Sequence, residues 1–168
     1  MNRFILATVA LLLINFNLWA QQQVAIKYAA EIMAQATLKG DYETLANYTQ
    51  PKVITLMGGR EKMIAVVKNG MAAMKNQGVT FKEASVGTPG KVVNTGTALY
   101  AVVPQRIVMQ TNQGSISTST SLLACSMNKG KTWYFTDAGN MTDAQLKQLF
   151  PGVLGKLVIP KRTTPVMQ

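Results

Sequence analysis

Few side chains in this sequence could carry out acid–base or nucleophilic chemistry. The chain has 168 residues, no histidine and a single cysteine, Cys125. Without histidine there is no serine–histidine–aspartate triad, no cysteine–histidine dyad, no histidine-ligated zinc and no histidine pH switch. One cysteine also excludes an internal disulfide and a CxxC pair. We therefore expect neither a metal nor any other cofactor.

The seven carboxylates are the remaining candidates for general acid–base work. Asp41 and Asp143 stand at expected helix starts, where the helix dipole favours negative charge. Glu31 and Glu61 fall on polar helix faces beside lysines. The others, no two of them close in sequence, are Glu43, Glu83 and Asp137. Because paired carboxylates are missing, we expect no enzyme, and an isomerase-like or cyclase-like activity of one of these three stays an alternative.

A hydroxyl-rich run, SISTSTS at residues 115–121, offers nucleophiles but no neighbouring general base. Its composition predicts a half-polar β-strand. Cys125 follows directly in the apolar run LLAC, residues 122–125, and we expect it to be a buried core residue.

The first twenty residues have the layout of a secretory signal peptide. Arg3 provides the positive charge, residues 4–18 are mostly apolar, and Ala20 is a small residue before three glutamines. We expect cleavage after Ala20 and a periplasmic or secreted mature protein, residues 21–168. A retained membrane anchor is the alternative, since the apolar run approaches the length of a span. After cleavage, no later stretch is apolar enough to make this an integral membrane protein.

The mature part reads as helices followed by strands. Apolar residues recur at helical spacing over residues 24–38 and 60–75, and Asp41 caps a short helix that Pro51 ends. Alternating patterns and turn residues predict strands over 79–86, 91–93, 97–110, 115–127 and 132–136. Pro104 predicts an edge position or a bulge. A Thr142–Gln145 capping box starts a last helix, 143–150, and residues 157–159 form a short strand or lie against the body. The class is α+β in one domain, residues 21–168.

Two local runs carry a family resemblance. GDYETLANY at residues 40–48 and GGREKMI at 58–64 resemble the front half of the nuclear transport factor 2-like superfamily, which includes ketosteroid isomerases and SnoaL-like polyketide cyclases. By order of elements the resemblance covers about residues 24–136, whereas the tail from Thr142 lies outside the usual pattern. It implies a cone-shaped, cystatin-like fold, in which a curved antiparallel sheet wraps around the N-terminal helices and holds a pocket at its mouth.

The superfamily's catalytic positions are occupied by other residues. Pro51 and Lys52 stand where the steroid isomerases have an aspartate base, and Met33 stands where they have an oxyanion tyrosine. No carboxylate occurs between Glu83 and Asp137 to match their second aspartate. The resemblance therefore implies a non-catalytic, exported member of the superfamily.

Binding is the remaining kind of function. The net charge of +10 comes from basic residues dispersed along the chain, without a basic arm or interleaved aromatics, so we expect no nucleic-acid partner. Our leading hypothesis is a binding or accessory protein for an apolar or anionic small molecule. The alternative is an assembly subunit, for instance a homodimer, that uses an exposed sheet face. The side chains we expect at the pocket mouth are Tyr48, Arg60, Tyr100, Arg106, Trp133 and Phe135. For Arg106, an exposed strand face is the simpler interpretation.

Overall fold

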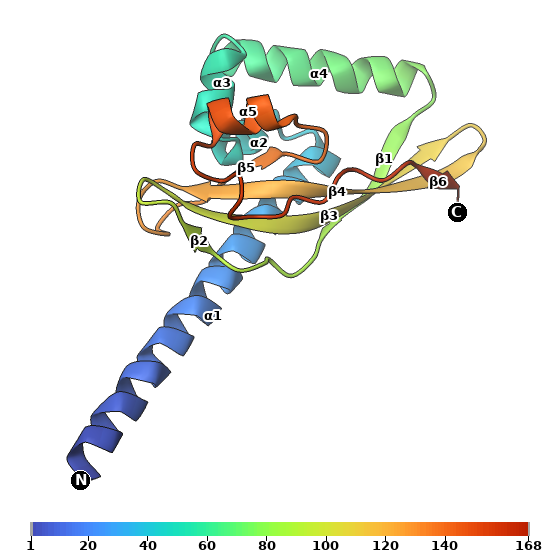
Figure 1. The fold of residues 1–168 in the computed structure, drawn as a ribbon. Helices are drawn as coiled ribbons and strands as arrows, with labels where there is room; N and C mark the ends of the chain where they lie inside the picture. The colour runs from blue at the N-terminus through green and yellow to red at the C-terminus, as the bar shows by residue number, and fades with distance from the viewer. Residues whose placement is uncertain (1, 168) are drawn as a thin grey trace.

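The computed structural model describes the backbone of residues 2–167 and the side chains of residues 20–167. Four helices come first, followed by a six-stranded antiparallel sheet with one helix inserted before the last strand (Figure 1). The helices are α1 (Asn2–Lys39), α2 (Tyr42–Tyr48), α3 (Pro51–Leu56), α4 (Arg60–Asn76) and α5 (Asp143–Leu149). The strands are β1 (Thr80–Val86), β2 (Val93–Asn94), β3 (Leu99–Thr111), β4 (Gly114–Ser126), β5 (Tyr134–Asp137) and β6 (Val166–Met167). The predicted α+β class is confirmed.

The chain forms α2 and α4 where the sequence predicts helices. Gly40, with a φ of 67°, ends α1, and Asp41 caps α2 by accepting a hydrogen bond from the Thr44 amide. Gly59 precedes α4 with a φ of 100°, a conformation that favours glycine. The prediction for Pro51 was incomplete, because this residue begins α3 as well as following α2. Proline suits a first helical position, where its missing N–H would have no partner in the helix.

Helix α1 runs without a break from Asn2 to Lys39, so it begins well before residue 24 (Figure 1). The expected cleavage point after Ala20 lies within this helix, and the side chains of the expected signal segment are outside the described residues. In the part of the chain whose side chains are described, no helix is both long enough and apolar enough for a membrane span.

The sheet has the order β1-β3-β4-β5, with β2 paired to β3 and β6 paired to β4. The β3–β4 hairpin keeps an unbroken register from Leu99 opposite Ser126 to Thr111 opposite Gly114. No bulge interrupts the β3–β4 ladder at Pro104, and β3 as a whole is not an edge strand. The predicted edge position holds locally, because on the side away from β4 the β1 ladder stops at Val86 opposite Gln105, one residue short of Pro104. The proline needs no N–H for that ladder, and its carbonyl accepts from the Gly87 amide at 2.8 Å.

Side chains alternate between two core clusters, one on each face of the sheet. Helix α1 covers the first face, whose buried residues are Ile26, Ala30, Met33, Ala101, Val103, Leu122, Ala124, Trp133 and Phe135. Helix α5 and the segment after it cover the second face, whose buried residues are Ala98, Tyr100, Leu123, Cys125, Ala138, Leu146, Phe150 and Val153. Because both faces are covered in the middle of the sheet, residues 120–126 of β4 are all buried.

The C-terminal part differs most from the predicted elements. The capping box of α5 is confirmed, since Thr142 and Gln145 exchange hydrogen bonds at the start of that helix. Residues 157–159 form no strand, and Leu157 and Ile159 pack half-buried against the second cluster. The chain then follows the edge of β4 and pairs with it as β6, which the sequence analysis did not predict.

Candidate functional site

The six residues expected at a pocket mouth lie in three different places. Trp133 and Phe135 are fully buried in the first core cluster, and Tyr48 packs half-buried against them. Tyr100 lies on the opposite face of the sheet, where its ring meets that of Phe150 edge-on at a centroid distance of 6.1 Å. The aromatic residues on the α1 side are thus covered by this helix and its side chains.

The two arginines of that set form exposed ion pairs. Arg60, the first residue of α4, donates to the Glu43 carboxylate at 2.7 and 3.2 Å and to the Glu43 carbonyl at 2.9 Å, which ties α4 to α2. Arg106 of β3 lies 3.5 Å from the Glu83 carboxylate on neighbouring β1. Exposed pairs of this kind stabilise a fold by at most about 1 kcal/mol.

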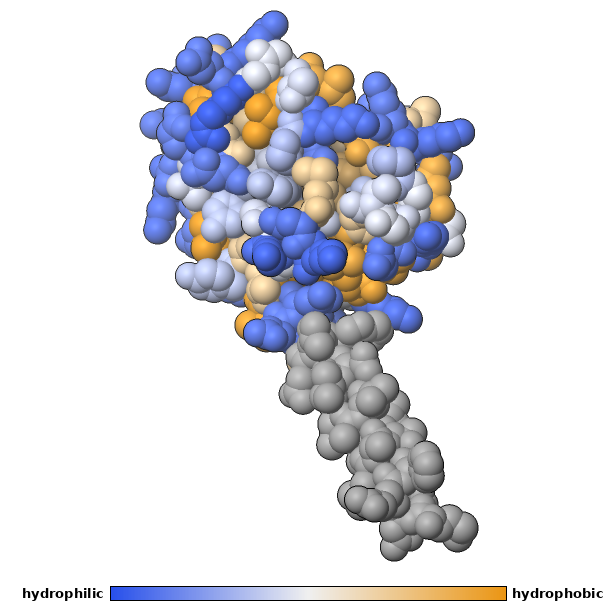
Figure 2. Space-filling model, turned by 90° about the vertical axis from the view of Figure 1, so that its left-hand side faces the viewer, coloured by the Kyte–Doolittle hydropathy of each residue, from blue (hydrophilic) through white to orange (hydrophobic). Residues whose placement is uncertain are grey.

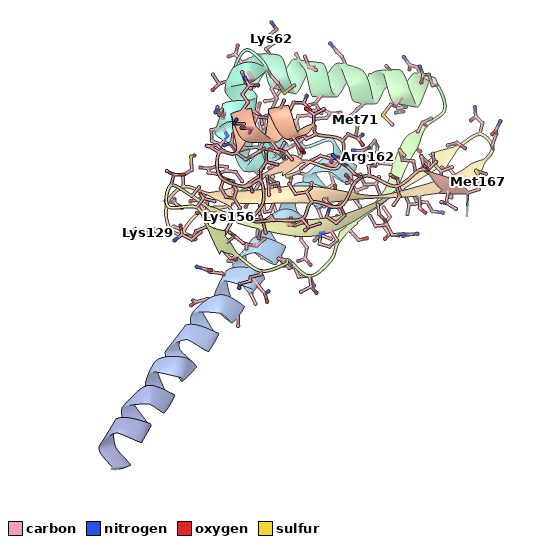
Figure 3. The ribbon with its side chains drawn as sticks, in the orientation of Figure 1. Lys62, Met71, Lys129, Lys156, Arg162 and Met167 are labelled. Carbon is pink, nitrogen blue, oxygen red and sulfur yellow. The ribbon has the colours of Figure 1, made fainter. Side chains whose placement is uncertain are left out.

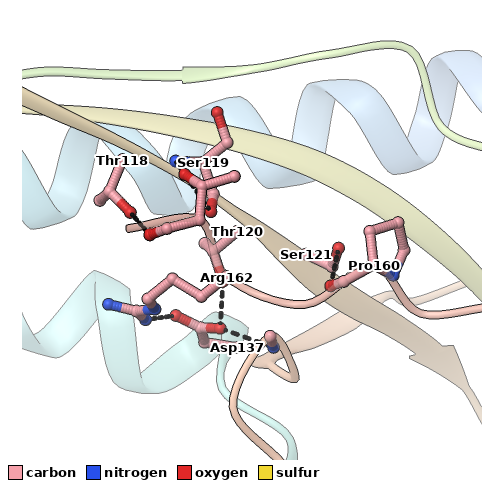
Figure 4. A network of polar contacts seen from close by, with 9 residues as sticks. Thr118, Ser119, Thr120, Ser121, Asp137, Pro160 and Arg162 are labelled. Atoms are coloured by element: carbon pink, nitrogen blue, oxygen red, sulfur yellow. Dashed lines mark hydrogen bonds and ion pairs between the residues drawn. The ribbon is translucent and has the colours of Figure 1, made fainter. Parts of the chain in front are cut away.

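Asp137 holds the C-terminal segment to the sheet (Figure 4). Its carboxylate accepts from the Thr120 hydroxyl at 2.7 Å and the Gly139 amide at 3.0 Å, and it pairs with Arg162. Each of the three carboxylates kept as catalytic candidates therefore faces an arginine. Among residues 20–167, no cluster of three or more carboxylate, thiol or imidazole groups is placed to hold a metal ion.

Cys125 is buried opposite Tyr100 on the β3–β4 pair, as the sequence predicts for the thiol. Burial raises the pKa of the Cys125 thiol. Burial also raises the pKa of Tyr100 to about 12, and the adjacent thiol adds to that shift. Both groups stay protonated and uncharged at neutral pH, which suits a core position and not a nucleophile.

An open groove lies where α1 ends, beneath α4 and beside the first residues of β1. Its volume is about 410 Å³. Its apolar lining comes from Leu38, Met71, Ala72, Val79 and Phe81, together with the ring of Tyr42. Three exposed lysines complete it, Lys39 from α1 and Lys68 and Lys75 from α4, and the lining contains no carboxylate.

Local sequence explains how the groove forms. Lys68, Met71, Ala72 and Lys75 have the spacing i, i+3, i+4, i+7, so they share one face of α4. Figure 3 shows Met71 on the side of this helix that faces the sheet, whereas Lys62 points away from it. After α4, Gly78 adopts a φ of 76° and turns the chain into β1, which brings Phe81 under the helix.

The sequence analysis missed this groove, although one signal was present. The periodicity of residues 60–75 was assigned to core packing, and the lysines on the same face were counted only as dispersed charge. A lysine at each end of an apolar helix face is the feature that could have identified it.

Other hollows of the described surface are lined differently. One of about 380 Å³ shares Lys39 with the groove but includes the carboxylates of Glu31 and Asp41. One of about 240 Å³ beside Lys129 and Lys131 is lined mainly by polar residues, with Ala25 as its apolar side chain.

Arg106 lines a further hollow of about 260 Å³ with residues of β1, β3 and β4, where it already pairs with Glu83. The face seen in Figure 2 is a mixture of polar and charged side chains with small, separate apolar spots. The groove under α4 is therefore the candidate site.

Comparison with known proteins identifies no relative: no protein-family model matches the sequence, and no curated protein or solved structure is significantly similar to it.

Proposed function

We propose that this chain is an exported, non-enzymatic binding or accessory protein that holds a small anionic molecule with an apolar body in the groove under α4. The observation that carries the proposal is the composition of that groove, an apolar floor with three lysines and no carboxylate. This pattern complements a ligand that has an apolar body and an acidic head, such as a carboxylate.

Within residues 20–167, the lysines of the groove form no close ion pair. None of Lys39, Lys68 and Lys75 takes part in an ion pair among the described side chains. The nearest carboxylate in sequence, Asp41, caps α2 through the Thr44 amide. This hydrogen bond is the main cause of its lowered pKa, and the charge of Lys39 contributes a smaller part. Three like charges around one hollow raise the local positive potential, and a bound anion would relieve their mutual repulsion.

The floor of the groove suits an apolar chain of variable shape. Met71 has a flexible, polarisable side chain that adapts to different ligands, and Phe81 gives a flat apolar surface beside it. The volume falls within the common range of about 300–1,000 Å³ for small-molecule sites. Binding here requires no catalytic group, consistent with the arginine-paired state of Glu43, Glu83 and Asp137.

The export and family parts of the proposal rest on the sequence. Residues 1–20 contain a positive charge, then an apolar stretch and then a small residue. This order supports a signal peptide and a periplasmic or secreted product. Membership of the nuclear transport factor 2-like superfamily is supported by the runs at residues 40–48 and 58–64 and by the order of helices before an antiparallel sheet.

Calorimetric titration with three ten-carbon amphiphiles tests the binding proposal. We expect decanoate to bind, decanol to bind at least ten-fold more weakly, and decyltrimethylammonium not to bind, because only the first combines the chain with a negative head. Equal binding of all three would show a nonspecific apolar surface and contradict the proposal.

A matched pair of variants places the site. Lys68→Glu with Lys75→Glu reverses two charges of the groove, and we expect decanoate affinity to fall at least ten-fold. Lys129→Glu with Lys131→Glu makes the same change in the exposed loop before β5 and should leave the affinity unchanged. Circular dichroism checks that both variants are folded, and an equal loss in the two would place the site elsewhere.

A further inference from the structure

Strand β4 has two different neighbours along the edge that faces away from β3. Beside Leu122–Cys125 this neighbour is β5, and beside Ile116 and Ser117 it is β6. We name residues 160–167 the strap, because this segment crosses the remaining edge of β4 from one end of β5 to the β3–β4 hairpin (Figure 1). The strap thus occupies the place of a sheet strand.

Polar contacts hold the strap, and the hydroxyl run of β4 makes most of them (Figure 4). The Thr163 amide donates to the Ser119 carbonyl at 2.9 Å, and the Thr118 hydroxyl donates to the Thr163 carbonyl at 2.9 Å. The Ser121 hydroxyl donates to the Pro160 carbonyl at 2.8 Å, and Arg162 pairs with Asp137. The serines and threonines at 115–121, which have no catalytic base, thereby gain a structural role as the strap's docking edge.

Apolar burial contributes little to this attachment. Every residue of the strap is exposed, including Val166 at 62% and Met167 at 55%. In the segment that leads to the strap, Leu157 and Ile159 pack half-buried against the second cluster, whereas Val158 between them is 89% exposed. A segment held by polar contacts that are exposed or only part-buried, without buried apolar side chains of its own, opens more easily than the core of its domain.

From these features we infer that the strap exchanges between two copies of this chain, each strap docking on the β4 edge of the other. When the strap leaves, β4 presents unpaired N–H and C=O groups, which readily accept another strand. The identical segment of a second copy makes the same hydrogen bonds and brings the arginine that Asp137 pairs with. Reciprocal exchange closes a two-fold dimer.

Disulfide trapping tests the inference with the full chain. One chain carries Ser119→Cys and a second carries Thr163→Cys, at exposed positions that are hydrogen-bonded partners in the structure. Mixed under mild oxidation, the two chains should form a disulfide-linked heterodimer. Its yield should exceed by at least five-fold that of a control mixture in which Lys129→Cys replaces Thr163→Cys. Because the net charge of +10 repels two copies, the yield should rise with ionic strength.

A chain that carries both Ser119→Cys and Thr163→Cys provides the reference. In dilute solution it should close internally as a monomer, which shows that the two positions can be bridged. A mixture that yields no more heterodimer than the Lys129→Cys control, beside a double variant that does close, would overturn the exchange. Failure of the double variant to close would show that the strap does not dock beside Ser119, and would also overturn the inference. These results are independent of decanoate binding, which involves neither β4 nor the strap.

Discussion

Helices α1 and α4 are both amphipathic, yet they are packed to very different degrees. Ile26 and Ala30 of α1 are completely buried against the sheet, whereas Met63 is the one fully buried side chain of α4 and Val66 on that helix is 51% exposed. Helical periodicity shows which side of a helix is apolar, but how closely this side is covered depends on the neighbouring elements. The close packing of α1 fills the side of the sheet where a pocket was expected, and the loose packing of α4 leaves a groove.

The largest expected effect is a difference in stability between the two helices. Ile26→Ala should lower the free energy of unfolding by about 2–5 kcal/mol, because it leaves a cavity in the core. Val66→Ala should lower it by less than about 0.5 kcal/mol, since this side chain is mainly in water. Urea denaturation of both variants measures the two values. Similar losses would contradict the difference in packing.

The second prediction concerns the dense packing on the other face of the sheet. The pKa of Tyr100 is raised from its ordinary value of 10.0 to about 12 in the fold, so the folded state holds this proton more tightly than the unfolded chain does. Tyr100 therefore contributes stability that is complete below pH 10 and lost as the pH rises toward 12, at up to about 1.4 kcal/mol for each pH unit.

Urea denaturation at several alkaline pH values measures this loss. Tyr100→Phe keeps the ring against Phe150 and removes the titrating hydroxyl, so its stability should fall less steeply between pH 10 and 12. The raised pKa of Cys125, whose ordinary value is 9.0, adds a loss that begins at lower pH and remains in the variant. An unchanged slope in Tyr100→Phe would show that the tyrosine is more accessible than the structure indicates.

The smallest effect is expected within α4. Gly70 lies in the middle of this helix with no atom within 4 Å of where a Cβ would be placed. Gly70→Ala should therefore raise the free energy of unfolding by about 0.5–1 kcal/mol through the lower entropy of the unfolded chain. Urea denaturation measures this gain. A loss of stability would show that α4 is packed more closely around Gly70 than the structure indicates.

Local signals predicted the elements of this fold well. Gly40, Asp41 and the Thr142–Gln145 capping box mark helix ends through their own backbone and side-chain hydrogen bonds, which depend on a few neighbouring residues. The β3–β4 hairpin follows in the same way from its alternating pattern and turn. The burial of Cys125 was also predictable, because its neighbours in the strand are apolar.

Contacts between distant segments could not be predicted in this way. The groove brings Leu38, Met71 and Phe81 together from three elements, and the strap meets β4 across more than forty residues of chain, as the Thr118–Thr163 hydrogen bond shows. The expected grouping of Tyr100 with Trp133 and Phe135 depended on which face each strand position takes, and the structure places them on opposite faces. Register and crossing geometry decide such groupings, and no local pattern specifies them.

A crystal structure of the chain with decanoate tests the central claim most directly. We predict that the carbon chain lies against Met71 and Phe81 and that the carboxylate is within hydrogen-bonding distance of Lys68 or Lys75. The Lys68→Glu, Lys75→Glu variant, crystallised in the same way, should show no decanoate there. A decanoate molecule bound at another place with this groove empty, or one unaffected by the charge reversal, would contradict the account.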